Sequence, residues 1–128
     1  NNDTTTERNK DNMWVFTQTG FVSAVRHRDD KTKLMVRGRD SESLEDLADM
    51  ASASIDHTPG GDYPYRVTIT DLQFMEWAEM QIETLDYTNF KSRVTITRGD
   101  VYHDACMDVW SAMHQVEDAN ARNRYATK

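Results

Sequence analysis

Beta-branched and aromatic residues dominate the chain from residue 13 to residue 39, in short runs separated by polar turns. We predict a break or bulge at Gly20 and a polar turn over residues 29–32. Residues 59–62 give a strong turn signal, and a short extended piece precedes them around residues 54–57. The strands predicted from this pattern cover residues 13–19, 21–27, 33–39 and 63–70. The order is a strand meander joined later by one further strand.

Helical periodicity marks three other segments, in which apolar residues recur every three or four positions. Asp40 or Ser41 can cap the first helix, because their side-chain oxygens accept from free backbone N–H groups. Thr70 and Gln73 have the spacing of a capping box and open the second helix. The expected helices end near residues 51, 85 and 118.

These elements together predict an α+β fold, a mostly antiparallel sheet with three to four helices packed on one face. We expect a kink over residues 86–90 and a short helical or irregular stretch over residues 91–97. Residues 1–12 contain only Asn, Asp, Thr, Glu, Arg and Lys, which is typical of a flexible arm or an added segment. Residues 13–118 form the single predicted domain, and residues 119–128 are expected to fray.

Composition and charge argue against several classes of function. The 128 residues carry 15 basic and 22 acidic side chains, a net charge of -7, and the mean hydropathy is -0.80. This balance argues against non-specific nucleic-acid binding and against membrane association. No apolar run approaches the ~20 residues of a membrane span, and no secretory signal is visible, so we expect a cytoplasmic protein. The single Cys106 excludes an internal disulfide and a multi-cysteine zinc site.

Charge is divided between the elements. The helices predicted after residues 70 and 99 carry acidic side chains and no Lys or Arg, whereas the strands are rich in arginine. Strand side chains alternate between faces, so Val25, Leu34 and Val36 are expected on the core side. The arginines predicted on the opposite, open face are Arg26, Arg28, Arg37, Arg39 and Arg66.

An arginine cluster on an open sheet face is suited to phosphate or carboxylate, because the planar guanidinium donates hydrogen bonds in pairs. We therefore predict a site for a small anionic ligand or an acidic protein partner on this face. The alternative is a solvated surface, balanced by Asp29, Asp30 and Asp40 or by the acidic helices of a neighbouring molecule.

The helix over residues 71–86 is apolar around much of its circumference. One face of this helix carries Leu72, Met75, Ala78, Ile82 and Leu85. Phe74, Trp77 and Met80 fall outside that face, and we predict that they form a contact with a protein partner or a second copy of the chain. Coverage by the last helix is an equally good explanation.

His103 is the candidate for catalysis, since it lies three residues from Cys106 on the last helix. No catalytic triad follows, because Asp104 points elsewhere on a helix and free cysteine is commonly buried. The histidines lack the spacing of a chelate, and no phosphate-binding loop is present, so we predict neither a metal nor a cofactor.

Several blocks in order resemble a small family of uncharacterised bacterial and phage proteins. They include Met13-Trp14, Thr19-Gly20-Phe21-Val22-Ser23, Thr58-Pro59-Gly60, Asp62-Tyr63-Pro64-Tyr65-Arg66, Leu85-Asp86-Tyr87-Thr88-Asn89-Phe90-Lys91 and Val109-Trp110. The resemblance covers residues 13–113 and implies that residues 1–12 are an extension. It brings no activity, cofactor or catalytic residue.

Three functional hypotheses remain. The first is a non-enzymatic binding module that uses the arginine face. The second is an acidic decoy whose helices, with Glu76, Glu79 and Glu83, occupy the basic groove of a nucleic-acid-binding protein. The third is a small hydrolase or transferase that uses His103.

Overall fold

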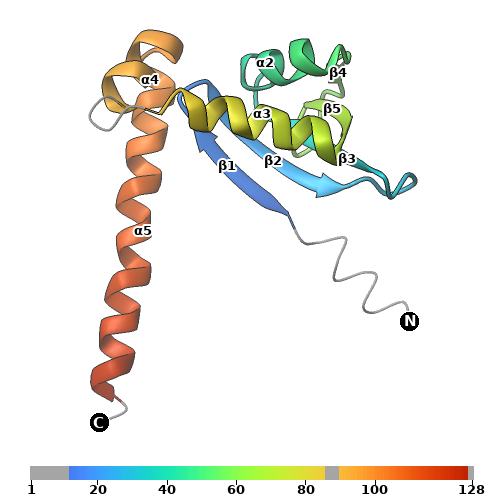
Figure 1. Ribbon diagram of the computed structural model, residues 1–128. Coiled ribbons are helices and arrows are strands. Elements are labelled where there is room, and N and C mark those ends of the chain that lie inside the picture. Colours follow the sequence, from blue (N-terminus) through green and yellow to red (C-terminus); the bar gives the residue numbers. More distant parts are fainter. Residues whose placement is uncertain (1–11, 86–89, 127–128) are drawn as a thin grey trace, which may run out of the picture.

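The computed structural model describes residues 12–85 and 90–126, and it contains a five-stranded antiparallel sheet with the strand order β1-β2-β3-β5-β4 (Figure 1). The strands are β1 (Met13–Thr17), β2 (Gly20–Arg26), β3 (Lys33–Gly38), β4 (Asp56–His57) and β5 (Tyr65–Thr70). The first three strands form the predicted meander, and β5 pairs with β3. The α+β fold is therefore confirmed.

Four helices accompany the sheet: α2 (Glu42–Ala51), α3 (Asp71–Glu83), α4 (Phe90–Arg98) and α5 (Asp100–Ala126). The capping box predicted for α3 is present, with both the Thr70 and the Gln73 side chains bonded to backbone N–H groups. The predicted kink falls on residues 86–89, outside the described residues. The predicted end of the last helix near Asp118 is wrong, because the polar residues that follow include no Gly or Pro to stop it.

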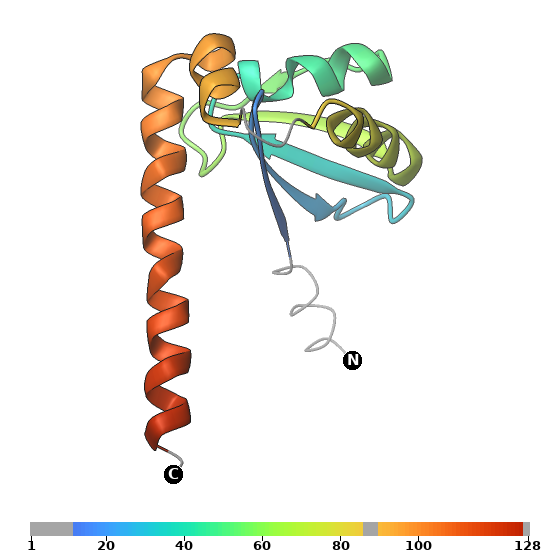
Figure 2. The ribbon, with the colours of Figure 1, turned by 60° about the vertical axis from the view of Figure 1, so that its left-hand side comes forward.

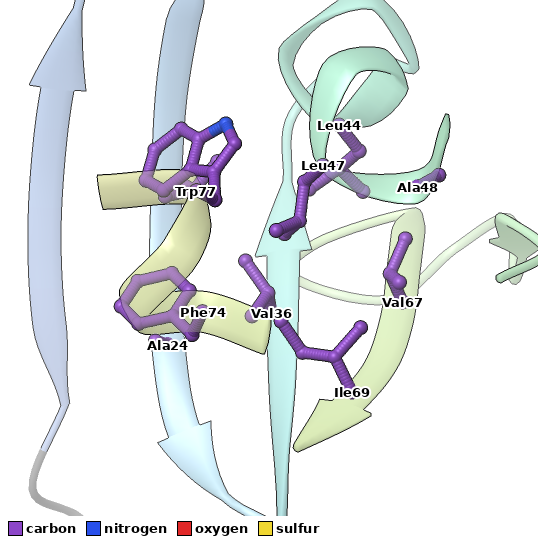
Figure 3. Close-up of a cluster of buried hydrophobic side chains, with 10 residues drawn as sticks. Ala24, Val36, Leu44, Leu47, Ala48, Val67, Ile69, Phe74 and Trp77 are labelled. Atoms are coloured by element: carbon purple, nitrogen blue, oxygen red, sulfur yellow. The ribbon is translucent and has the colours of Figure 1, made fainter. Parts of the chain in front are cut away.

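Helices α2 and α3 cover one face of the sheet, and the core lies between them and the strands (Figure 3). The sheet contributes Ala24, Val36, Val67 and Ile69, and α2 contributes Leu44, Leu47 and Ala48. Phe74 and Trp77 of α3 complete this layer, with their rings stacked at 5.5 Å between centroids. Burial of each large apolar side chain contributes about 1.5–3 kcal/mol, so this layer holds the fold together.

The buried face of α3 corrects the sequence analysis. Trp77 is 1% exposed and Phe74 is 6% exposed, whereas Leu72 is 69% exposed. The prediction that Phe74 and Trp77 form a partner contact is therefore wrong, although Met80 does lie partly exposed. The two bulky aromatic rings pack in one core cluster with Val22 and Ala24 of β2, and the small side chain of Ala24 leaves room beside it.

The register of β2 differs from the prediction by one residue. Ala24 lies opposite Val36 and Val25 lies opposite Met35, so Ala24 faces the core and Val25 lies on the open face. Arg26 lies opposite Leu34, on the helix-covered side, so its predicted place on the open face is wrong. A one-residue shift moves every side chain of a strand to the other face.

Helices α4 and α5 meet at a corner that is fixed to the turn between β1 and β2. The Arg98 guanidinium donates to the carbonyl of Thr19 at 2.8 Å, and the Tyr102 hydroxyl donates to the carbonyl of Thr17 at 2.7 Å. From this corner α5 extends past the sheet as one long rod (Figures 1 and 2). Among the described residues, no helix has the length and apolar character needed to cross a membrane.

Candidate functional site

The sheet face opposite α2 and α3 carries two depressions. The first, here called the arginine depression, has a volume of about 390 Å³ and is lined by Arg28, Arg37, Arg66 and Asp29, with Val25 and Met35 among the apolar residues. Arg26 reaches its edge from the helix-covered side of β2. The second, here called the aromatic groove, has a volume of about 620 Å³ and lies between the sheet and α5. Three of the five predicted arginines therefore meet in one depression, Arg26 borders it, and Arg39 lies in the other.

Arg37 and Arg66 form the centre of the arginine depression. They lie directly opposite each other on β3 and β5 and share the open face. The Arg37 side chain donates to the Ser23 hydroxyl at 2.9 Å, and Arg66 donates to the carbonyl of Tyr63 at 3.3 Å. Among residues 12–85 and 94–117, whose side chains the structure describes, no carboxylate lies within ion-pair distance of either guanidinium. The two like charges face each other across the strands, which is unfavourable. Three carboxylates lie nearby but outside ion-pair distance: Asp29 in the lining of the depression, Asp56 opposite Arg66 on β4, and Asp62.

Burial lowers the pKa of Arg37, and the nearby positive charges of Arg66 and Arg39 act in the same direction. A guanidinium nevertheless remains protonated in proteins, so the charge persists. The Nε atom of Arg37 is buried and has no hydrogen-bond acceptor. An anion that entered the depression would supply a counter-charge beside the two guanidinium groups.

Tyr63 links the two depressions. Its ring is buried, with the Arg37 guanidinium 4.5 Å and the Arg39 guanidinium 4.3 Å from the ring centroid. Arg39 also donates to the carbonyl of Asp62. Stacking on an aromatic ring holds a guanidinium in place without neutralising it, so both cations are positioned but not paired.

Arg26 is the one predicted site arginine that has an ion-pair partner. Its guanidinium contacts both carboxylate oxygens of Asp71 at the start of α3, at 2.6 and 3.2 Å. The hydrogen bond from Arg26 lowers the pKa of Asp71, so that pair stays charged at neutral pH. Arg26 borders the depression but its charge is already balanced.

The aromatic groove has an apolar wall on each side. On the sheet side it is lined by Trp14 and Phe16 of β1 and Phe21 of β2, and the rings of Phe16 and Phe21 stack at 4.5 Å. On the helix side it is lined by Val101, Ala105 and Val109 of α5. These aromatic rings lie on the open face because Trp14 pairs with Ser23 and Phe16 with Phe21.

Arg98 closes one end of the groove. Its side chain is only 7% exposed and pairs with Asp40 and, at 3.3 Å from Nε, with Glu42. Partial burial alone would raise the pKa of Asp40, but hydrogen bonds from Ser43 and the charge of Arg98 outweigh it and lower that pKa. The single guanidinium is thus held by two carboxylates, and the cluster serves to position the corner of α4 and α5 against the sheet.

His103, the predicted catalytic candidate, lies outside both depressions. Its Nδ1 atom lies 3.1 Å from the neighbouring Asp104 carboxylate. Cys106 is buried, and burial raises the pKa of Tyr102, which keeps the hydroxyl of Tyr102 protonated as a donor. No cluster of potential metal ligands is found among the described residues. The hydrolase hypothesis thus gains no geometrical support.

Comparison with protein-family models, with curated proteins and with solved structures found no match for this chain. The resemblance drawn from sequence blocks therefore stays a prediction. The functional argument depends on the geometry of the open face alone.

Sequence reasoning missed the aromatic groove and Arg98. A signal for the groove was available, because Met13, Trp14, Val15 and Phe16 are apolar without alternation. An edge strand with apolar side chains on both faces indicates contact on both faces. Arg98 gave no signal of its own, since its role depends on how α4 docks near Asp40.

Proposed function

We propose that this protein is a non-enzymatic binding module whose arginine depression receives a carboxylate or phosphate group. The group belongs either to a small anionic ligand or to an acidic protein partner, since both present the same chemistry to a guanidinium. The observation that carries the proposal is the opposed pair Arg37 and Arg66, which has no carboxylate partner among the described residues.

The geometry supports this in two further ways. Arg28 of the β2–β3 connection adds a third unpaired cation to the rim of the depression. The positions of Arg37 and Arg66 are fixed by hydrogen bonds to Ser23 and to the carbonyl of Tyr63, so an anion would meet prearranged donors. The overall charge of -7 disfavours long polyanions, which fits a local anionic group rather than a nucleic-acid strand.

The test is titration of the protein with three probes, citrate, inorganic pyrophosphate and an oligo-glutamate peptide, followed by calorimetry at low and high salt. We expect binding by at least one probe, weakened by salt. Preference for citrate or pyrophosphate points to a small ligand, and preference for the peptide points to a protein partner. Arg37→Gln and Arg66→Gln should each reduce the affinity by roughly tenfold or more, because each removes charge-assisted hydrogen bonds.

Lys31→Gln is the matched control. It removes the same single charge from the neighbouring turn, where Lys31 is exposed and lines neither depression. Its affinity should stay close to that of the unaltered protein. Failure of all three probes to bind at low salt, or equal losses in Lys31→Gln and Arg37→Gln, would overturn the proposal.

A further inference from the structure

The outer part of α5 is an apolar helix face without a cover. Trp110 is 63% exposed, Met113 is 58% exposed and Val116 is 51% exposed, and the last buried side chain described on the helix is Cys106. Figures 1 and 2 show this part of the helix standing clear of the sheet. An isolated helix of this length is only marginally stable in water, so packing against another surface is needed to stabilise it.

Met113 and Val116 continue a stripe that begins in the aromatic groove, whereas Trp110 lies outside it. The spacing of three and four residues places one apolar stripe along a single face of α5. Its members are Val101, Ala105, Val109, Met113 and Val116. The first three line the groove. One continuous apolar surface therefore runs from the aromatic side chains of β1 and β2 out along α5.

An acidic stripe borders this apolar stripe. Asp100, Asp104 and Asp108 are all exposed, each one position before a member of the apolar stripe, and none has a Lys or Arg partner among the described residues. On the sheet side the aromatic groove is lined by Arg39 and Arg98 together with Asp40 and Glu42. Arg98 pairs with both carboxylates, whereas Arg39 has no ion-pair partner among the described side chains. The chain thus carries an acidic, apolar helix and a groove with apolar walls in which the Arg39 charge is unpaired among those side chains.

We infer that the occupant of the aromatic groove is α5 of a second copy of this chain, in a two-fold symmetric dimer. Each chain offers both the helix and the groove, so a two-fold axis satisfies both at once. The apolar stripes of the two α5 helices pack on each other and on Trp14 and Phe16, and each acidic stripe approaches the partner's Arg39. A helix of 27 residues spans roughly 40 Å, enough to bury on the order of 800 Å² per partner, as in stable interfaces.

The first experiment measures mass against concentration by sedimentation equilibrium with the full chain. We expect a monomer–dimer equilibrium. The variant Met113→Glu with Val116→Glu should raise the dissociation constant by roughly tenfold or more, because it places carboxylates in the apolar stripe. Both side chains are exposed in the single chain, so the monomer should keep its fold, which circular dichroism can verify.

Ser111→Glu with Gln115→Glu is the matched control. It adds the same two charges to the same turns but outside the apolar stripe, and it should leave the dimer intact. A protein that stays monomeric at all concentrations, or a dimer equally sensitive to both double variants, would overturn the inference.

Charge reversal tests the orientation of the partner. Asp104→Lys with Asp108→Lys should weaken the dimer, and adding Arg39→Glu should restore part of the loss, since the attraction is then rebuilt with reversed signs. A dimer unaffected by the reversal contradicts the two-fold arrangement. The inference is independent of the anion-binding proposal, because Lys31, Arg37 and Arg66 variants report on anion binding alone and the α5 variants report on mass.

Discussion

At the scale of single residues, the arginines fall into two groups, those with a carboxylate partner and those without one among the described residues. Arg98 is buried against Asp40 and Glu42, and Arg26 is paired with Asp71, so their charges are used within the fold. Arg37 and Arg66 lack carboxylate partners among the described residues and lie on an open face. The arginines, which the sequence does not distinguish, therefore include some that stabilise the fold and others that can bind an anion. The proposal for anion binding depends on that division.

Asp40 provides a prediction about acid stability. Its lowered pKa means that the ionised form is stabilised in the folded state. The stabilisation is fully present above the unfolded pKa of about 3.9 and is lost as the pH falls through the lower, folded value. We therefore expect Asp40→Asn to reduce the free energy of unfolding by about 1–2 kcal/mol near neutral pH, a moderate loss because Asp40 is half exposed.

Urea unfolding of the two proteins at about pH 7 and at about pH 3 measures this difference. The gap between them should narrow at the lower pH, because Asp40 of the unfolded chain takes up a proton there more readily than Asp40 of the folded protein. A gap of the same size at both pH values would show that the carboxylate charge of Asp40 is not what holds Arg98.

At the scale of elements, the sequence predicted the strands, the helices and the α3 capping box, because alternation, periodicity and caps are local. It did not predict which faces meet. The face of α3 was mistaken because Leu72, Met75 and Ile82 make a regular stripe, yet that stripe faces solvent. The face of α3 that packs on the sheet depends on the space beneath the helix, where the small side chain of Ala24 in β2 leaves room for Phe74 and Trp77. Such a fit depends on two elements and is invisible in either alone.

The α3 faces can be compared by a pair of substitutions. Trp77→Ala should lower the free energy of unfolding by about 3–5 kcal/mol, because it leaves a large cavity in the core. Leu72→Ala should change it by no more than about 0.5 kcal/mol, because Leu72 is exposed. Thermal and urea unfolding give both values. Similar losses in the two variants would mean that the regular stripe, and not the aromatic pair, faces the core.

The same reasoning applies to the candidate site. Alternation placed Arg37 and Arg66 correctly on the open face, since both lie in the middle of strands with fixed register. It misplaced Arg26, because the start of β2 at Gly20 sets a register that residue type does not reveal. The aromatic groove depends on how α4 and α5 turn back onto the β1–β2 end, a long-range arrangement held by Arg98 and Tyr102.

At the scale of the whole molecule, charge and apolar surface are segregated together. The sheet face opposite α2 and α3 carries both arginines and aromatic rings, while α5 carries carboxylates beside an apolar stripe. Such a molecule carries complementary surfaces on one chain, since the first turns of α5 line the groove and the rest of the helix extends away from the sheet (Figures 1 and 2). Self-association through these surfaces leaves the arginine depression, at the other end of the open face, for a ligand.

Hydrogen exchange at different protein concentrations provides the last prediction. In the monomer, the amides of α5 from Trp110 to Glu117 should exchange quickly, because the side chains along this part of the helix are exposed. Dimer formation covers it, so exchange there should slow as the concentration rises through the dissociation constant. The amides of Val36 and Val67, which lie in the core strands, should show no such dependence and serve as the internal control. Exchange at Trp110 that stays constant while the measured mass doubles would place the interface elsewhere on the molecule.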